Sequence, residues 1–242
     1  MKVQLFHTCL VNELDPDVGV AVVRVLERLG VEVEVPLAQT CCGQPAYNAG
    51  FHADARTVAR HTIAVLHATE GPIVVPSGSC ADMVIHQYAV LLHDEPDWLA
   101  KARAVADRCR EFSQFVFERL QGAARGGRLR ARIAYHPSCH LLRGLGVREP
   151  PKALLGGLEG VELVGIRDEE ECCGFGGLFS VTNPEISGAI MDRKLTAVEA
   201  SGADRLVSCD LGCLLHLAGG LRRRGSRVQA QHLAQALDEA LQ

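Results

Sequence analysis

The triplet Cys-Cys-Gly occurs twice in this chain of 242 residues, at positions 41–43 and 172–174. Each triplet is preceded by one cysteine that ends a short strand-like run and followed by another that ends an apolar run. Equivalent cysteines in the two halves are separated by 130, 131, 131 and 133 residues. A frame of a rare residue that recurs at a nearly constant offset predicts an internal duplication. The eight repeated cysteines are Cys9, Cys41, Cys42 and Cys80, then Cys139, Cys172, Cys173 and Cys213.

The segments between the cysteines repeat as well. We expect strands at 2–7, 31–35, 73–75, 132–136, 161–166 and 206–207, and helices at 18–29, 51–68 and 184–200. Residues 94–120 and 229–241 are expected to close the two repeats as helices; the alternative is a short fourth strand, near residue 109 and at 226–229. The predicted organisation is a first repeat over 1–120, a linker over 121–131 and a second repeat over 132–242.

Alternation of strands and helices predicts an α/β fold of two pseudo-symmetric repeats, each a small parallel sheet with flanking helices. Every repeated cysteine then lies at the carboxyl end of a strand, the edge at which parallel sheets bind ligands. Four thiols should therefore meet in each half, near the cleft between the halves. The glycines beside them allow the backbone to approach a bulky ligand closely.

Thiolates prefer zinc, copper(I) or iron–sulfur clusters among the metals of proteins. Structural zinc sites usually draw their cysteines from two C-x2-C turns. Here each adjacent pair has one single cysteine before it and one after it in the chain, each at least 32 residues away. Adjacent thiolates fit different irons of a cluster more naturally than one small tetrahedral ion, so the spacing favours an iron–sulfur cluster. A zinc-stabilised scaffold and a metal-free thiol redox sensor are the alternatives.

Composition excludes several other functions. The net charge of −4 carries no electrostatic signature of nucleic-acid binding. We expect neither a signal peptide nor a membrane span, hence a cytoplasmic protein with reduced cysteines rather than a disulfide framework. The sequence lacks the G-x-G-x-x-G dinucleotide motif after a strand, and G-x-S-x-G and H-E-x-x-H as well.

Longer motifs surround the cysteines in both halves, among them CCGQPAYNAGF, PSGSCADM, YHPSCHLLRGLGV and ECCGFGGLFSV. In these the chain resembles the CCG-domain (cysteine-rich domain) family of iron–sulfur oxidoreductase subunits. That family includes the cysteine-rich subunit of heterodisulfide reductase and the iron–sulfur subunit of glycolate oxidase, and the chain is most similar to its lactate-utilisation branch. The resemblance runs through both halves.

The resemblance implies electron transfer in a complex that oxidises L-lactate to pyruvate, with a ferredoxin-like iron–sulfur protein and a third component as partners. Action on glycolate or on a heterodisulfide is the alternative within the family. It implies one iron–sulfur cluster per repeat, of the [4Fe–4S] type, held by the eight repeated cysteines, with Cys209 as a further candidate ligand. The fuller family pattern has a fifth cysteine per repeat; Ser77 and Asp210 stand at those positions.

Other residues near the frame have ordinary interpretations beside functional ones. Cys109 has no counterpart in the second half and is expected to be a buried thiol. His7 and His136 precede the first cysteine of each repeat; a hydrogen-bonded structural role is favoured over tuning of a cluster. His140 and His216 are candidates for proton coupling or substrate contact. Asp210 is expected to cap the following helix.

Overall fold

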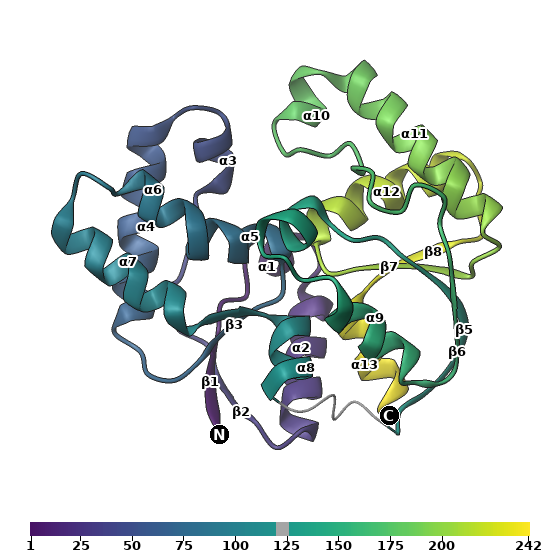
Figure 1. Ribbon diagram of the computed structural model, residues 1–242, viewed down its shortest axis with the longest axis horizontal. Coiled ribbons are helices and arrows are strands. Elements are labelled where there is room, and N and C mark those ends of the chain that lie inside the picture. Colours follow the sequence, from purple (N-terminus) through teal and green to yellow (C-terminus); the bar gives the residue numbers. More distant parts are fainter. Residues whose placement is uncertain (120–125) are drawn as a thin grey trace.

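The computed structural model describes residues 1–119 and 126–242 and contains two four-stranded parallel sheets (Figure 1). The first sheet has the order β2-β1-β3-β4 and the second the order β6-β5-β7-β8, so the two repeats share one topology. The predicted α/β fold with a duplicated parallel sheet is confirmed. The strands are β1 (Lys2–Leu5), β2 (Glu32–Glu34), β3 (Ile73–Val75), β4 (Cys109–Glu111), β5 (Arg128–Tyr135), β6 (Glu159–Val164), β7 (Arg205–Ser208) and β8 (Gln229–His232).

Helices connect these strands and flank the sheets (Figure 1). The first repeat contains α1 (Cys9–Leu14), α2 (Pro16–Arg28), α3 (Gln44–Asn48), α4 (His52–His67), α5 (Gly78–Asp82), the π-helix η1 (Met83–Gln87), α6 (Tyr88–Leu91), α7 (Pro96–Arg108) and α8 (Phe112–Arg119). The second contains the π-helix η2 (His140–Gly144), α9 (Glu149–Gly156), α10 (Phe179–Thr182), α11 (Pro184–Ala200), α12 (Leu211–Arg223) and α13 (Leu233–Ala240). No helix among the described residues has both the length and the apolar character that a bilayer crossing requires.

The expected linker is partly wrong. Residues 120–125 lie outside the described residues, but β5 begins at Arg128, so 128–131 belong to a strand. In this segment Leu129 and Ala131 are buried while Arg128 and Arg130 are exposed. The three arginines within 128–132 make the segment look like a charged loop, although they occupy the outward positions of a period-two strand.

Both closing segments contain a strand, as the alternative interpretation held near residue 109, whereas the second strand lies at 229–232 rather than at 226–229. Residues 109–111 form β4, which pairs in parallel with β3, and α8 follows it. The Glu111 side chain accepts a hydrogen bond from the backbone N–H of Ser113, which ends the strand and starts this helix. In the second repeat, β8 takes residues 229–232 and α13 begins only at Leu233, after the capping side chain of His232.

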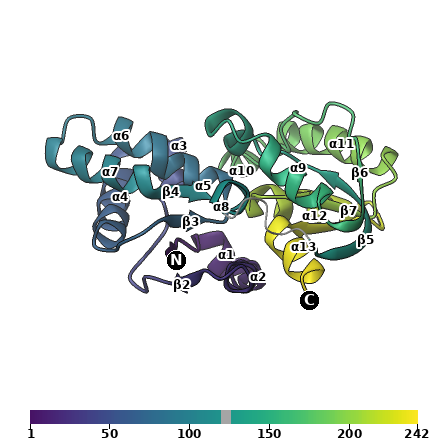
Figure 2. The same cartoon turned by 60° about the horizontal axis from the view of Figure 1, so that its bottom comes forward.

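The two repeats share one hydrophobic core. Helix α2 of the first repeat packs on α13 of the second, and α9 of the second packs on α8 of the first. Each repeat thus contributes helices that pack on the other repeat. Both termini lie on the side of the molecule that carries α2 and α13 (Figure 2). Leu26, Phe115, Leu155 and Leu237 are all fully buried in this shared cluster. Each such side chain contributes about 2 kcal/mol to stability, so the repeats stabilise each other.

Candidate metal centre

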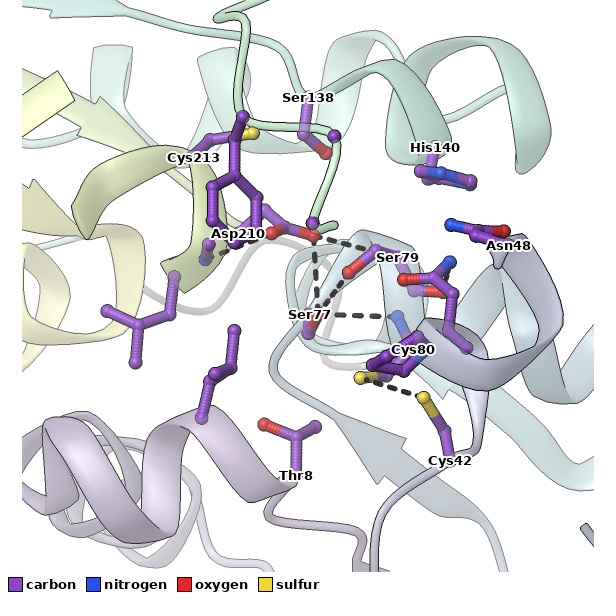
Figure 3. A pocket seen from close by; sticks show the side chains of 18 of the residues that line it. Thr8, Cys42, Asn48, Ser77, Ser79, Cys80, Ser138, His140, Asp210 and Cys213 are labelled. Carbon is purple, nitrogen blue, oxygen red and sulfur yellow. Dashed lines mark hydrogen bonds between the residues drawn. The ribbon is translucent and has the colours of Figure 1, made fainter. Parts of the chain in front are cut away.

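All eight repeated cysteines line one cavity of about 270 Å³ (Figure 3). The expectation that the quartets meet near the cleft between the halves is therefore met. Apolar side chains from both repeats share the lining, among them Leu10, Phe175 and Leu211. The cavity is the place where the cysteine-bearing strand ends of both sheets converge.

In the first quartet the adjacent cysteines Cys41 and Cys42 contact different partners. Cys9 starts α1 directly after β1, and Cys80 lies in α5 directly after β3. The Sγ of Cys41 lies 3.5 Å from that of Cys9, whereas the Sγ of Cys42 lies 3.4 Å from that of Cys80. The two neighbours therefore diverge to different strand ends and close the quartet between them.

Backbone geometry in the Cys-Cys-Gly loops favours negative charge on the sulfurs. The N–H of Gly43 donates to Sγ of Cys41 at 3.4 Å, and the N–H of Gly174 donates to Sγ of Cys172 at 3.3 Å. Both glycines have positive φ, +84° and +93°. A Cβ at residue 174 would lie 2.5 Å from the carbonyl oxygen of Ser187, so only glycine fits there.

The pKa values of the thiols show how negative charge is distributed within each quartet. Hydrogen bonds from the thiols of Cys42 and Cys9 lower the pKa of Cys41 to about 2, and equivalent hydrogen bonds lower the pKa of Cys172 to about 2. The pKa of Cys9 rises because its thiol donates to this thiolate and is also desolvated. Each quartet thus contains one thiolate that is stabilised by neighbouring neutral thiols. Ionisation of all four requires a bound cationic centre, and a soft thiophilic metal fits this donor set.

The second quartet repeats this arrangement and adds a histidine. The neighbouring thiols of Cys139 and Cys173 lower the pKa of Cys172, and those of Cys172 and Cys213 raise the pKa of Cys173. The side chain of His136 is fully buried, and neither ring nitrogen has a hydrogen-bond partner within the described structure. Burial lowers the pKa of His136 to about 3, so the ring is neutral. The hydrogen-bonded structural role favoured for His136 therefore finds no partner among the described residues.

Register explains why the two halves differ here. The backbone N–H of His136 donates to the carbonyl of Val207, and in the first repeat the N–H of Phe6 donates to the carbonyl of Val74. His136 is therefore equivalent to Phe6 and not to His7. The spacing agrees, because Phe6 and His136 each lie three residues before the first cysteine of their repeat, whereas His7 lies two before it.

The two positions of the missing fifth cysteines are occupied by helix caps. Ser77 Oγ accepts from the N–H of Cys80 at 3.3 Å, and Asp210 Oδ1 accepts from the N–H of Gly212 at 3.2 Å. Across the repeats, Asp210 Oδ2 accepts from Ser77 Oγ at 3.3 Å and from the N–H of Ser79 at 2.9 Å. The predicted capping role of Asp210 is confirmed. In Figure 3 the contacts of Asp210 and Ser77 lie between Cys213 on one side and Cys42 and Cys80 on the other.

The remaining candidates lie around the quartets. His140 lines the cavity, and its Nδ1 lies 2.7 Å from Asp82 Oδ2 of the other repeat, an ion pair that raises the pKa of His140. His216 lies behind the second loop, with Nε2 3.4 Å from Ser187 Oγ. Cys209 does not line the cavity; it is buried, with Sγ 3.7 Å from the hydroxyl of Tyr135.

Cys109 behaves as predicted from the sequence, whereas Thr8 and Ser138 are cavity residues that the sequence did not single out. Cys109 is buried in β4 as expected, and burial raises its pKa to about 12. Thr8 lines the cavity with φ of +65°, a backbone conformation that is rare outside glycine and often occurs at functional sites. Ser138 lines the cavity beside Cys139.

Comparison with known proteins agrees with this geometry. The model of the cysteine-rich domain (CCG) matches residues 3–85 and 133–218, one match in each repeat. The chain therefore belongs to the cysteine-rich domain (CCG) family.

Within this family the chain is similar to proteins called lactate utilization protein A. It is 44% identical to that of Bacillus cytotoxicus over 238 residues, covering 98% of this chain and 99% of the relative. It is 44% identical to that of Halalkalibacterium halodurans, with 98% and 97% covered, and 42% identical to that of a Geobacillus species, with 98% and 99% covered. A solved structure of a putative Asp/Glu racemase from Yersinia pestis aligns along the whole length of both chains with a TM-score of 0.40 and 14% identity, too weak a likeness to carry an argument.

Proposed function

We propose that this chain holds two [4Fe–4S] clusters, one on each cysteine quartet, and carries electrons in a complex that oxidises L-lactate to pyruvate. The observation that supports this most strongly is that both quartets line a single cavity. Two redox centres that face one cavity are placed to exchange electrons, whereas two structural metal ions gain nothing from such a shared space. Four cysteine thiolates per cluster are the usual ligand set of a [4Fe–4S] cluster.

The spread of the sulfurs favours a cluster over zinc. A four-cysteine zinc site holds each sulfur about 2.3 Å from one ion, which brings every pair of sulfurs within about 4 Å. Among the described residues, the group of potential ligands whose donor atoms all lie within 4.8 Å of one another is His136, Cys173 and Cys213. Neither complete quartet has all four donor atoms within this distance, so neither is closed as a tetrahedral zinc site, which supports a larger cofactor for both.

The chemistry of the proposed reaction matches two centres. Oxidation of a 2-hydroxy acid to a 2-oxo acid releases two electrons and two protons. A bound iron–sulfur cluster supplies one-electron acceptance, so two clusters hold both electrons. The protein's own contribution is to hold the thiolates, to stabilise their charge through the N–H groups of Gly43 and Gly174, and to limit water with Phe175 and Leu211.

Substrate oxidation itself belongs, in this proposal, to a partner subunit. The sequence carries no dinucleotide motif, and the cavity is dominated by sulfur and apolar side chains. We propose a ferredoxin-like iron–sulfur protein and a third component as partners, with this chain as an oxidoreductase subunit that is active in their presence. The names of the relatives, which refer to lactate utilisation, support L-lactate as the substrate.

The test is reconstitution of the complex under anaerobic conditions. We expect the three components together, but no two of them, to reduce an artificial electron acceptor when L-lactate is added. The Cys42→Ser variant should lose this activity, and the Cys109→Ala variant, which alters a cysteine remote from the cavity, should keep it. Reduction driven by glycolate instead would place the chain in another branch of the family. Full activity of Cys42→Ser would contradict the proposal.

A further inference from the structure

The least satisfied polar group beside the cavity is the imidazole of His136. It follows directly on β5, its exposed fraction is 0%, and both ring nitrogens are without a partner in the described structure. A buried polar group without a hydrogen bond destabilises the folded state. Such an orphan is worth explaining, because most buried polar groups in proteins are satisfied.

Two cysteine sulfurs lie close to this ring. Donor atoms of His136, Cys173 and Cys213 lie within 4.8 Å of one another. The nearby cation, Lys194, is already satisfied, because its Nζ donates to the carbonyls of Asp168 and Glu169 at 2.9 Å each. A neutral thiol is a weak acceptor, whereas a thiolate accepts strongly because it is charged. The ring therefore acquires a good partner only when the quartet ionises around a metal centre.

The arrangement exists in one repeat alone. At the equivalent position of the first repeat stands Phe6, whose side chain is also fully buried and offers no N–H. The two frames share four thiols, a Cys-Cys-Gly loop and a glycine N–H directed at the first cysteine of the pair. At this buried position behind the sulfurs, the two repeats differ by an imidazole against a phenyl ring.

We propose that His136 donates a hydrogen bond from a ring N–H to a thiolate sulfur of the pair Cys173 and Cys213, and that this gives the second centre a higher reduction potential than the first. The inference rests on the proposed function, because it requires a redox-active centre on each quartet. A hydrogen bond to a ligand sulfur withdraws negative charge and stabilises the reduced state, which raises the potential. An electron delivered to the first centre by a partner then moves to the second, which is oxidised before the transfer and reduced after it.

The test exchanges the two residues. His136→Phe copies the first repeat into the second, Phe6→His does the reverse, and His7→Phe is the matched control for loss of a histidine near a cluster. Iron and sulfide are counted in each protein, and the potentials of the two centres are then measured by redox titration with electron paramagnetic resonance. Pulsed measurements on protein labelled with ¹⁵N-histidine report how the ring nitrogen contacts the centre.

We expect two separate potentials in the native protein and a weak nitrogen coupling to the centre of higher potential. In His136→Phe the higher potential should fall by at least the equivalent of a tenfold change in the reduction equilibrium, about 59 mV for one electron. Phe6→His should raise the lower potential, and His7→Phe should leave both unchanged. If His136→Phe does not assemble, Phe6→His still decides the question.

Two results would overturn the inference. Full cluster content with potentials unaltered in His136→Phe or Phe6→His would show that the imidazole does not tune the centre. A strong nitrogen coupling, typical of a direct ligand, would replace the hydrogen bond with coordination. Absence of iron and sulfide from the native protein would be a failure of the proposed function instead, so the two failures are distinguishable.

Discussion

The carboxylate of Asp210 accepts a hydrogen bond at 2.9 Å from the backbone N–H of Ser79, which belongs to the other repeat. The same carboxylate caps α12 and accepts from the hydroxyl of Ser77, which caps α5. The residues at the fifth-cysteine positions of the two repeats are thus joined to each other across the cavity. They fasten the two halves together at the point where the quartets meet.

Replacement of Asp210 should therefore destabilise the protein. Asp210→Ala removes a helix cap, worth about 1 kcal/mol, and leaves the half-buried N–H of Ser79 without a partner, which costs about 1–3 kcal/mol more. We expect the free energy of unfolding to fall by about 3 kcal/mol in chemical denaturation. Asp107→Ala, at an exposed position of α7, is the control and should change stability by about 0.5 kcal/mol at most. Equal stability of the two variants would refute the fastening role.

Single cysteine substitutions should remove one centre at a time. Cys42→Ser breaks the 3.4 Å contact with Cys80 and removes a ligand of the first quartet, and Cys173→Ser does the same in the second. Each variant should keep about half of the iron and sulfide of the native protein, about four of each per chain for a cubane cluster. Cys109→Ala should keep all of it. Loss of both centres in each variant would instead indicate one cofactor shared across the cavity.

Two glycine substitutions are expected to act in opposite directions. Gly174→Ala places a Cβ 2.5 Å from the carbonyl oxygen of Ser187 in a backbone with φ of +93°, so it should destabilise the loop and reduce the metal content of the second quartet. Gly188→Ala lies within α11, where a Cβ meets nothing within 4 Å. Because alanine is the better helix former, this variant should be about 0.5–1 kcal/mol more stable. Thermal unfolding and metal analysis of both variants check the pair.

Stability should depend on pH through Glu111. Burial raises the pKa of this carboxyl to about 7 from the ordinary value of 4.5, despite hydrogen bonds from Ser113 and Gln114. Between these two values the folded state binds the proton and the unfolded state does not, so the stabilising contribution is present below about pH 4.5 and is lost as the pH rises to about 7. The full loss is about 3 kcal/mol.

The neutral analogue of Glu111 tests this dependence. Glu111→Gln should remove this part of the pH dependence. The unfolding free energy of the variant minus that of the native protein should therefore increase from pH 5 to pH 8, because only the native protein loses this contribution. Glu13→Gln, at an exposed position, serves as the control. A difference that stays constant over this range would contradict a raised pKa for Glu111.

Sequence reasoning predicted the features that depend on local pattern. The duplicated cysteine frame led to two equal sheets, and β3 was recognisable because Ile73, Val74 and Val75 form a buried apolar run. It left helix and strand as alternatives where tertiary contacts decide. The strand β4 contains Arg110 and Glu111, which are poor strand formers, and it exists because it pairs with β3 and is buried there.

The same limit applies to the site. The cysteine positions followed from the repeat, but the partners of each cysteine depend on how the two neighbours in the pair diverge. The equivalence of His136 and Phe6, which are 130 residues apart like Cys139 and Cys9, is confirmed by their matching backbone hydrogen bonds. The joining of Ser77 to Asp210 across the repeats could not be predicted either, because it depends on the reciprocal packing of the halves.

The central claim is that each quartet holds an iron–sulfur cluster, and the most direct test is the content of iron, acid-labile sulfide and zinc in anaerobically purified protein. We predict about eight iron and about eight sulfide per chain, the content of two cubane clusters. Stoichiometric zinc, with sulfide absent even after anaerobic reconstitution, would contradict the account and leave a zinc-stabilised scaffold in its place.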